Sequence, residues 1–245
     1  MGKTVEIISD HLSNFGYINL NHMEERTATI IGATGLIGSQ LADMLGKDGY
    51  FDRIRVVVRR QVKFNNPVID VRVIDFEDKV AFRSAIEGSI AVFCAVGTTQ
   101  KKVKGDKDAY RKVDYEIPVL TARLCAETGC RCYTLVSSVG ANSKSKNFYL
   151  RLKGEVEDTL RDIKINSINI FRPSMLLGDR QEFRAGEMLG KALAVPLSFL
   201  FPADYRPVHG LNVAKAMISA SKKCTPGFHI MHYREILKLA GDYSF

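Results

Sequence analysis

The residues best suited to proton transfer in this chain are Tyr149 and Lys153, which stand four positions apart in the segment YLRLK. On a helix this spacing places both side chains on one face. A lysine ammonium beside a phenol favours the phenolate form, so the tyrosine can donate and accept a proton near neutral pH. Ser137 and Ser138 end the apolar run before the pair, and one of them can hold a substrate carbonyl against the tyrosine. Since the spacing is common by chance, a surface pair is the alternative.

A second group of residues suits the binding of a phosphate. Gly32, Gly35 and Gly38 stand in the segment GATGLIG, between an apolar run that predicts a strand over 27–31 and a pattern that predicts a helix over 35–45. At such a turn the pyrophosphate of a dinucleotide rests on the helix N-terminus, and glycine lets the backbone approach it closely. This context favours a nucleotide site over a purely structural turn.

The residues after the second predicted strand indicate which dinucleotide is bound. NAD sites usually carry Asp or Glu about 20 residues after the glycines, where it accepts a hydrogen bond from the ribose 2′-hydroxyl. Here Arg59 stands 21 residues after Gly38, and Arg60 follows it. Two guanidiniums can bind a 2′-phosphate, which predicts NADP(H) rather than NAD, with a solvated strand end as the alternative. Asp75, after the third predicted strand, either accepts a hydrogen bond from the adenine amino group or caps the next helix.

The elements that must position these residues alternate regularly from residue 27 onward. Apolar runs predict strands over 27–31, 54–58, 71–74, 90–95, 132–136, 167–171 and 228–231. Amphipathic patterns predict helices over 35–45, 77–87, 108–127, 149–162 and 213–221, with a short one at the C-terminal end. Continuous apolar strands alternating with helices indicate a parallel sheet covered on both faces. We therefore expect an α/β fold, a Rossmann-type doubly wound parallel sheet with a small C-terminal cap.

One domain is expected over 23–245, because no Pro-, Gly- or Ser-rich linker interrupts this pattern. Within it, residues 178–245 are expected to contribute the substrate-side cap. The first 22 residues differ, since Val5, Ile8, Leu12 and Phe15 recur at a spacing that predicts a short amphipathic helix. This extension either contacts a protein partner or a second copy of the chain, or packs on its own domain.

The composition is that of a soluble globular protein, with 46% hydrophobic and 25% charged residues. The net charge of +8 and a basic cluster over 101–112 suit nucleic acid, but no aromatic pattern or DNA- or RNA-binding motif accompanies them, so we expect a solvated loop. No signal peptide or membrane span is visible, and the five cysteines form no CxxC pair or zinc spacing. We expect no metal, no membrane and a cytoplasmic location.

These segments together resemble the short-chain dehydrogenase/reductase superfamily, in its atypical branch. The resemblance rests on IIGATGLIGSQL, VVVRR, VIDFED, FCAVGTT, TLVSSVGANSKSKNFYLRLKGEVED and FRPSMLLGDRQEFRAGE, which follow one another over about residues 29–190. It implies that Tyr149 is the proton donor and that Lys153 bonds the nicotinamide ribose. It also implies cofactor contacts from the turn and the strand ends: Thr34, Gly35, Leu36 and Ile37 on the pyrophosphate, Arg59 and Arg60 on the 2′-phosphate, Val96 and Gly97 on the ribose, and Leu176 and Arg184 closing over the cofactor.

One residue departs from the family pattern. Many short-chain dehydrogenases carry Asn in the long helix, where it supports a water-linked proton relay. The comparable position here reads Val113-Asp114. The resemblance therefore leaves two alternatives, in which Asp114 holds a water or turnover is poor.

Two functions of different classes follow. The first is an NADP(H)-dependent reductase of a small carbonyl or enone substrate, in which Tyr149 delivers the proton. The second is an NADP(H)-binding regulatory or redox-sensing protein with little or no turnover, for which Asp114 and the N-terminal extension are the motivation. The short cap disfavours a sugar-nucleotide epimerase, which normally needs a larger C-terminal portion.

Overall fold

A seven-stranded, all-parallel sheet in the order β3-β2-β1-β4-β5-β6-β9 forms the centre of the molecule. The computed structural model describes residues 25–178 and 202–244, apart from the side chain of Ala203. The strands of this sheet are β1 (Thr27–Ile31), β2 (Arg53–Val58), β3 (Ile69–Val73), β4 (Ser89–Cys94), β5 (Cys132–Val136), β6 (Ser167–Phe171) and β9 (Gly227–Met231). The sheet order reverses between β1 and β4, which is where open α/β sheets bind their ligands.

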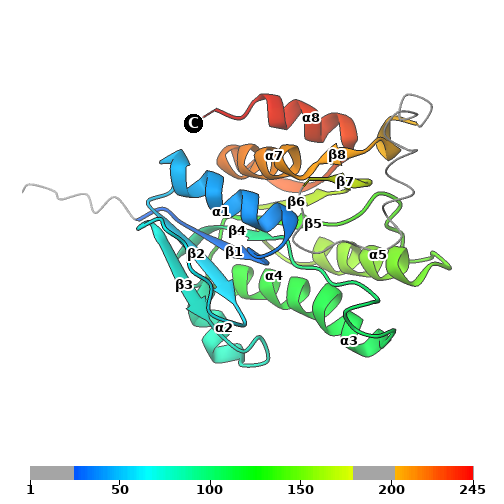
Figure 1. Cartoon of the computed structure of the whole chain (residues 1–245), viewed down its shortest axis with the longest axis horizontal. Helices are drawn as coiled ribbons and strands as arrows, with labels where there is room; N and C mark the ends of the chain where they lie inside the picture. Colours follow the sequence, from blue (N-terminus) through cyan, green and yellow to red (C-terminus); the bar gives the residue numbers. More distant parts are fainter. Residues whose placement is uncertain (1–24, 179–201, 245) are drawn as a thin grey trace, which may run out of the picture.

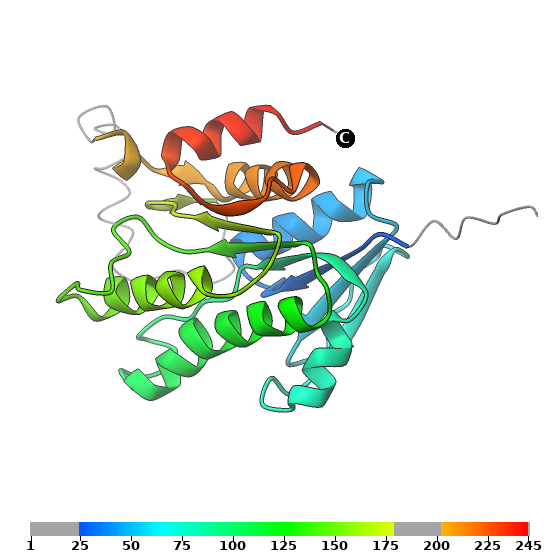
Figure 2. The same ribbon diagram turned by 180° about the vertical axis from the view of Figure 1, so that it is seen from behind.

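Helices cover both faces of the sheet, as Figure 1 and the reverse view in Figure 2 show. The first layer consists of α1 (Leu36–Asp48), α7 (Gly210–Lys223) and α8 (Tyr233–Gly241). The second consists of α2 (Lys79–Ile86), α3 (Lys107–Arg111), the π turn η1 (Lys112–Glu116), α4 (Ile117–Glu127) and α5 (Phe148–Arg161). Each layer packs its apolar face on the sheet and encloses a separate hydrophobic core. The predicted doubly wound fold is therefore confirmed.

Local sequence signals account for where several helices begin. The Asp78 carboxylate accepts the backbone N–H groups of Val80 and Ala81, both at 3.0 Å, at the start of α2. Asn147 accepts the N–H of Leu150 at 3.1 Å at the start of α5. Such side chains satisfy backbone donors that have no partner within the helix. Because α5 starts at this cap, its first turn carries the tyrosine of the predicted Tyr/Lys pair.

The predicted elements agree with the structure in type and nearly in length, with two differences. The long helix expected over 108–127 is divided into α3, η1 and α4. Part of the segment expected as a cap belongs to the main layers, since β9 pairs with β6 and α7 packs on the sheet beside α1. A separate pair of short parallel strands, β7 (Leu176–Leu177) and β8 (Val208–His209), follows β6, with the short 3-10 helix η3 (Ala203–Tyr205) before β8.

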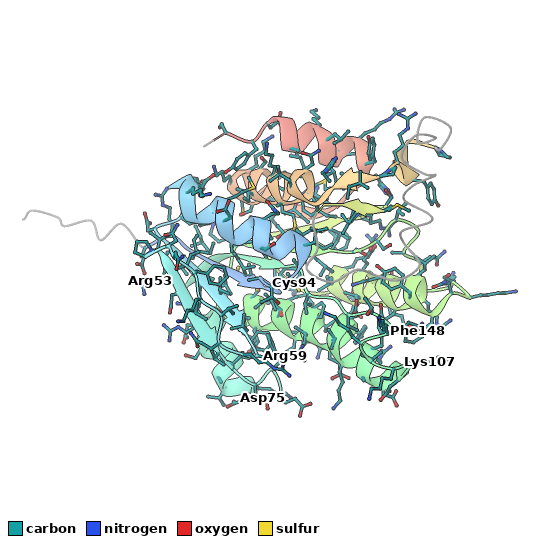
Figure 3. All side chains as sticks on the ribbon, in the orientation of Figure 1. Arg53, Arg59, Asp75, Cys94, Lys107 and Phe148 are labelled. Carbon is teal, nitrogen blue, oxygen red and sulfur yellow. The ribbon has the colours of Figure 1, made fainter. Side chains whose placement is uncertain are left out.

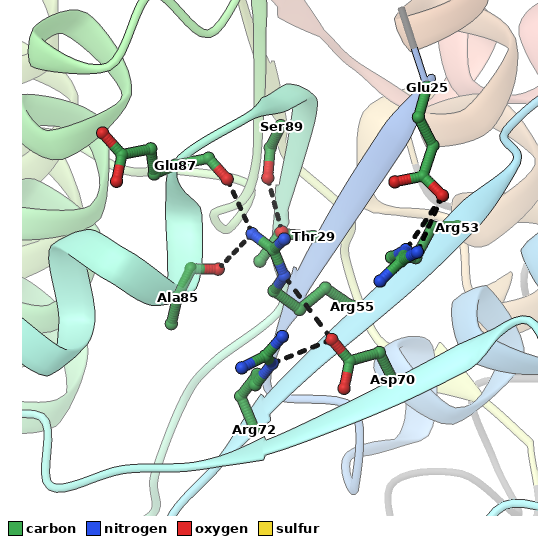
Figure 4. A network of polar contacts seen from close by, with 9 residues as sticks. All are labelled: Glu25, Thr29, Arg53, Arg55, Asp70, Arg72, Ala85, Glu87 and Ser89. Atoms are coloured by element: carbon green, nitrogen blue, oxygen red, sulfur yellow. Dashed lines mark hydrogen bonds and ion pairs between the residues drawn. The ribbon is translucent and has the colours of Figure 1, made fainter.

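The amino-terminal edge of the sheet is held by a network of polar contacts (Figure 4). Arg55, on β2, donates to the carbonyl oxygens of Ala85 at 3.0 Å and Glu87 at 2.8 Å, at the end of α2. A cation there satisfies the last carbonyls of a helix and complements its dipole. The hydroxyls of Thr29 and Ser89, 2.7 Å apart, join β1 to β4. This edge is structural, which leaves the opposite, carboxyl-terminal edge for chemistry.

Neither a membrane-spanning helix nor a metal-binding cluster occurs in the part of the chain that the structure describes. In residues 25–178 and 202–244, no helix has the length and apolarity that crossing a bilayer requires. The same residues contain no cluster of three or more histidine, cysteine or acidic side chains arranged to hold a metal ion.

Candidate active site

The glycine turn brings the backbone of β1, α1 and β4 into close contact. Gly32 adopts φ +90°, a left-handed conformation that favours glycine. A Cβ at Gly32 would lie 2.7 Å from the backbone nitrogen of Val96, and one at Gly38 would lie 2.1 Å from the carbonyl oxygen of Gly32. The turn closes through a 3.0 Å hydrogen bond from the Gly35 N–H to the Gly32 carbonyl. A larger residue at Gly32 would push the turn away from the segment after β4, and one at Gly38 would push α1 away from the end of β1.

The N-terminus of α1 is suited to an anion. Its capping residue is Gly35, and no side chain among the described residues accepts a hydrogen bond from the first turn. The free backbone N–H groups and the positive end of the helix dipole therefore face outward together. This is the arrangement that binds a pyrophosphate, so the residues present fit a dinucleotide.

The segment after β4 links this turn to the candidate catalytic helix. The N–H of Thr98 donates to Oδ2 of Asp114 at 2.7 Å, and a Cβ on Gly97 would lie 3.5 Å from Oδ1 of the same carboxylate. The hydroxyl of Tyr110 donates to the Thr98 carbonyl at 3.2 Å. The Val96–Gly97 segment, predicted to line the ribose, is thus fixed to α3 and the π turn beyond it.

Lys153 and Asp114 form a buried ion pair with 2.9 Å between Nζ and Oδ1, and their side chains are only 5% and 2% exposed. Burial disfavours the charged lysine, but the Asp114 carboxylate, together with Tyr149, outweighs it and raises the pKa of Lys153 above its usual value. Both oxygens of Asp114 have partners, Lys153 and Thr98. Asp114 therefore favours the charged form of the lysine.

Tyr149 stands in the first turn of α5, with the Lys153 ammonium 6.0 Å from the centre of its ring. The two side chains share a face of the helix, as the spacing predicted. The tyrosine is half-buried. Within the described residues its phenol has no hydrogen-bond partner, which leaves the hydroxyl available to a bound molecule.

The two serines after β5 differ in what their hydroxyls contact. Ser137 is buried and donates to the carboxylate of Glu157, which also binds the Arg172 guanidinium. Ser138 is half-buried, and its hydroxyl donates only to the carbonyl of Val139, at 3.2 Å. The Ser138 hydroxyl can easily exchange this hydrogen bond for one to a substrate oxygen. Of the two serines left open by the sequence, Ser138 is the better placed to orient a substrate.

The residues predicted to contact the adenosine lie at the carboxyl ends of β2 and β3. Arg59 and Arg60 directly follow β2 and are exposed. Asp75 follows β3 by two residues and accepts the N–H of Glu77 at 3.0 Å. The cap of α2 is Asp78, so the helix-capping alternative for Asp75 is wrong. Figure 3 shows Arg59 and Asp75 on the side of the molecule occupied by β2, β3 and α2.

The strand pair β7–β8 lies against the phosphate turn. A Cβ on Gly178 or on Gly210 would lie 3.0 Å from the side chain of Leu36, the first residue of α1. Leu176, predicted to close over the cofactor, is half-buried in β7. Arg184 lies outside the described residues, as does most of the expected cap, so its predicted contact stays a prediction.

Two features of the site were not foreseen. The Asp114–Lys153 pair joins residues 39 positions apart in sequence, and no local pattern marks it. Gly154, next to Lys153, would place a Cβ 2.1 Å from the backbone nitrogen of Ser143, because the loop after β5 packs directly on α5. A glycine inside an otherwise regular helix was the available signal for this close approach.

A parallel sheet with a glycine turn at an open helix N-terminus defines a dinucleotide-binding protein of the Rossmann class. Residues 32–189 match the family described as NAD(P)H-binding, and the chain belongs to this family. Protein HTATIP2 of Rattus norvegicus is 30% identical over 226 residues, which cover 90% of this chain and 91% of the relative. The mitochondrial protein FMP52 of Debaryomyces hansenii is 33% identical over 205 residues, covering 82% and 90%.

Solved structures agree on the fold. MoeE5 in complex with UDP-glucose and NAD superposes with a TM-score of 0.64 at 15% identity, over 88% of this chain and 81% of that one. UDP-glucose 4-epimerase from Thermotoga maritima gives a TM-score of 0.63 at 16% identity, over 88% and 82%. At such identities the likeness concerns the fold alone. Together with the family match, it confirms the resemblance drawn from the sequence.

Proposed function

We propose that this protein is an NADP(H)-dependent reductase of a small carbonyl or enone compound. The observation that carries the proposal is the Tyr149–Lys153–Asp114 group, held beside the segment that follows β4 by the 2.9 Å ion pair and the 2.7 Å bond to Thr98. A bound nicotinamide would supply the hydride. The chain's own residues would supply position, charge and a proton.

Each residue has a separate task in this mechanism. The N-terminus of α1 would bind the pyrophosphate, and Arg59 with Arg60 would bind the 2′-phosphate. Ser138 would donate a hydrogen bond to the substrate carbonyl. Tyr149 would release its proton to the developing oxyanion, and the fixed charge of Lys153 stabilises the phenolate that remains.

The preference for NADP(H) over NAD(H) is part of the proposal. It is supported by two exposed guanidiniums at the end of β2, where an NAD site carries a carboxylate. Within the described residues, neither arginine has an ion-pair partner that would compete with a phosphate. Asp75, two residues beyond β3, would accept a hydrogen bond from the adenine amino group.

The test is a screen of carbonyl and enone compounds that follows the loss of NADPH absorbance with purified protein. Tyr149→Phe should lower the rate of any reaction found by about 10²- to 10⁴-fold, the usual contribution of a general acid, while NADPH affinity is retained. Tyr115→Phe is the control, because that hydroxyl bonds Thr159 at 3.0 Å. Full activity in Tyr149→Phe would remove the tyrosine from the mechanism.

A second candidate function is an NADP(H)-binding regulatory or redox-sensing protein with little or no turnover. One observation favours it, since the Asp114 carboxylate is buried and both of its oxygens bond protein groups, Lys153 and the Thr98 N–H. Tight NADPH binding without turnover on the whole panel would favour this function over the reductase. The N-terminal extension, residues 1–22, is then the segment to delete when partners are sought.

We further propose a cytoplasmic location. All five cysteines are free thiols, which suits a reducing compartment. Fractionation of cells that express the tagged full chain tests this, and recovery in an organelle pellet would contradict it. No nucleic-acid partner is proposed.

A further inference from the structure

Four of the five cysteines gather at the amino-terminal side of the sheet, away from the candidate active site. Cys125 is near the end of α4, Cys130 lies in the following turn, Cys132 opens β5, and Cys224 ends α7. The candidate active site lies at the carboxyl ends of the same strands. The proposed function uses none of these thiols.

Two of the four thiols, those of Cys132 and Cys224, lie close together although β6 separates β5 from β9. Cys132 pairs with Ser167 in β6, and Ser167 pairs with Gly227 in β9, three residues after Cys224. The sulfur of Cys224 lies 3.5 Å from the carbonyl oxygen of Arg131, the residue directly before Cys132. Cys224 therefore lies beside Cys132, close enough for each thiol to shift the pKa of the other.

Amide groups contact both sulfurs of this pair. Nδ2 of Asn166 lies 3.6 Å from Sγ of Cys224, and Nδ2 of Asn169 lies 3.6 Å from Sγ of Cys132. Cys224 has φ +43°, a left-handed conformation that favours glycine at the end of a helix. A cysteine in such a conformation, with a second thiol beside it, points to a role for the sulfur.

The two thiols differ in access and in acidity. Cys224 is half-buried, whereas Cys94, Cys125, Cys130 and Cys132 are buried. The hydrogen bond from Cys132 lowers the pKa of Cys224 against the opposing effect of burial, with help from Asn166 and Arg131. The hydrogen bond to Cys224 and then burial raise the pKa of Cys132. An accessible thiolate therefore stands next to a protonated, protected thiol.

We propose that Cys224 is a modification site that reacts with hydroperoxides and that Cys132 then closes a disulfide with it. In the first step the Cys224 thiolate attacks one peroxide oxygen, the O–O bond breaks, and the leaving oxygen takes a proton. Cys224 is then a sulfenic acid. In the second step the Cys132 sulfur attacks the Cys224 sulfur, the S–O bond breaks, and hydroxide leaves as water with the Cys132 proton. Two thiols give two electrons to one hydroperoxide.

The experiment treats the reduced full-length protein with hydrogen peroxide and measures intact mass, free thiols and disulfide-linked peptides. The expected product has lost two hydrogen atoms, retains three of the five thiols (five minus two), and contains one Cys132–Cys224 peptide. Dithiothreitol should reverse it. Cys132→Ser should stop at a sulfenic acid on Cys224 that dimedone traps, and Cys224→Ser should form neither product.

The chain offers a matched control pair. Cys125 and Cys130 are also adjacent thiols, but both are buried, 0% and 4% exposed. Cys130→Ser should therefore leave the Cys132–Cys224 disulfide unchanged. The proposal is overturned by a Cys125–Cys130 disulfide in its place, by a wild-type protein that keeps five thiols, or by overoxidation of Cys224 without a cross-link.

Discussion

At the scale of single residues, Asp114 controls the distribution of charge in the candidate site. Its carboxylate is 1% exposed and bonds both the Lys153 ammonium and the Thr98 N–H, so a positive charge is held next to Tyr149. Because the pKa of Lys153 is raised above its ordinary 10.5, the lysine contributes stability that is complete below its unfolded pKa. That contribution fades only as the pH rises through the folded value.

Breaking this pair should destabilise the protein strongly. Asp114→Ala leaves an uncompensated buried charge on Lys153, and removing one partner of a buried pair typically costs about 3–5 kcal/mol in the free energy of unfolding. Urea denaturation measures the change. Asp43→Ala is the matched control, because the Asp43–Lys47 pair is as close, 2.6 Å, but its side chains are 60% and 59% exposed. A loss in Asp114→Ala no larger than in the control would contradict the charge assignment.

The wild-type pair should also show a flat pH response. From about pH 6 to about pH 9 the lysine stays charged in both the folded and the unfolded state, so the pair adds no slope to stability over that range. Urea denaturation of the wild type and of the Lys153→Met/Asp114→Leu double variant at several pH values isolates the contribution of the ion pair. If the free energy of unfolding of the wild type rises steeply above that of the double variant from neutral to mildly alkaline pH, Lys153 loses its proton in the folded protein at a lower pH than we expect.

The two arginines after β2 should control coenzyme choice. Arg59→Ala should weaken NADPH binding by about tenfold to a hundredfold, since a hydrogen bond to a charged group contributes about 1.5–3 kcal/mol, and it should leave NADH binding nearly unchanged. Calorimetry measures both affinities. Arg53→Ala is the control, because Arg53 stands at the opposite end of the same strand (Figure 3) and pairs with Glu25 at 2.9 Å (Figure 4). Equal losses for both coenzymes in Arg59→Ala would argue against a 2′-phosphate contact.

At the scale of elements, the helix over 107–127 shows what the sequence could and could not predict. Its apolar spacing predicted a helix, and the position of Asp114 within it was correct. Pro118 has no N–H to donate to the Asp114 carbonyl, and the Ile117 N–H bonds the Lys112 carbonyl, five residues back rather than four. The resulting π turn contains Asp114, and π turns often occur at functional sites. The spacing of apolar residues predicts helices and strands, but it does not predict a single π turn within a helix.

The packing of α5 on the loop after β5 gives an element-scale prediction. Gly154→Ala would place a methyl group 2.1 Å from the backbone nitrogen of Ser143, so the loop that carries Ser138 must move. Overpacking of this kind typically costs about 1–3 kcal/mol in the free energy of unfolding. Gly241→Ala is the control, since nothing lies within 4 Å of its Cβ position. Denaturation midpoints of the two variants test this. Equal midpoints would show that the loop can move without a loss of stability.

For the whole molecule, the sequence predicted the sheet, its parallel strands and its two covered faces. Buried strands such as β4, with the sequence SIAVFC, and β2, which ends in VVV, give nearly continuous apolar runs that are easily recognised. The pair β7–β8 escaped prediction because two-residue strands have no periodicity. Contacts between distant segments, such as Lys153 with Asp114, depend on the assembled sheet rather than on any local pattern.

Ligand binding should stabilise the whole molecule. A ligand at a hundred times its dissociation constant adds about 2.7 kcal/mol to the stability of the folded state. For a chain of this size that corresponds to a rise in Tm of roughly 5–10 °C. Thermal unfolding with NADPH measures it, and a Gly38→Val variant, whose side chain would meet the Gly32 carbonyl, should show no shift. A wild-type Tm that is unchanged at saturating NADPH would exclude binding to the folded state.

We propose that two guanidiniums at the end of β2 select the phosphorylated coenzyme. Calorimetric titration of the wild-type protein with NADPH and with NADH, in the same buffer, measures this selection. NADPH should bind at least about tenfold more tightly, because charge-assisted bonds to the 2′-phosphate are absent with NADH. Equal affinities, or tighter binding of NADH, would contradict it.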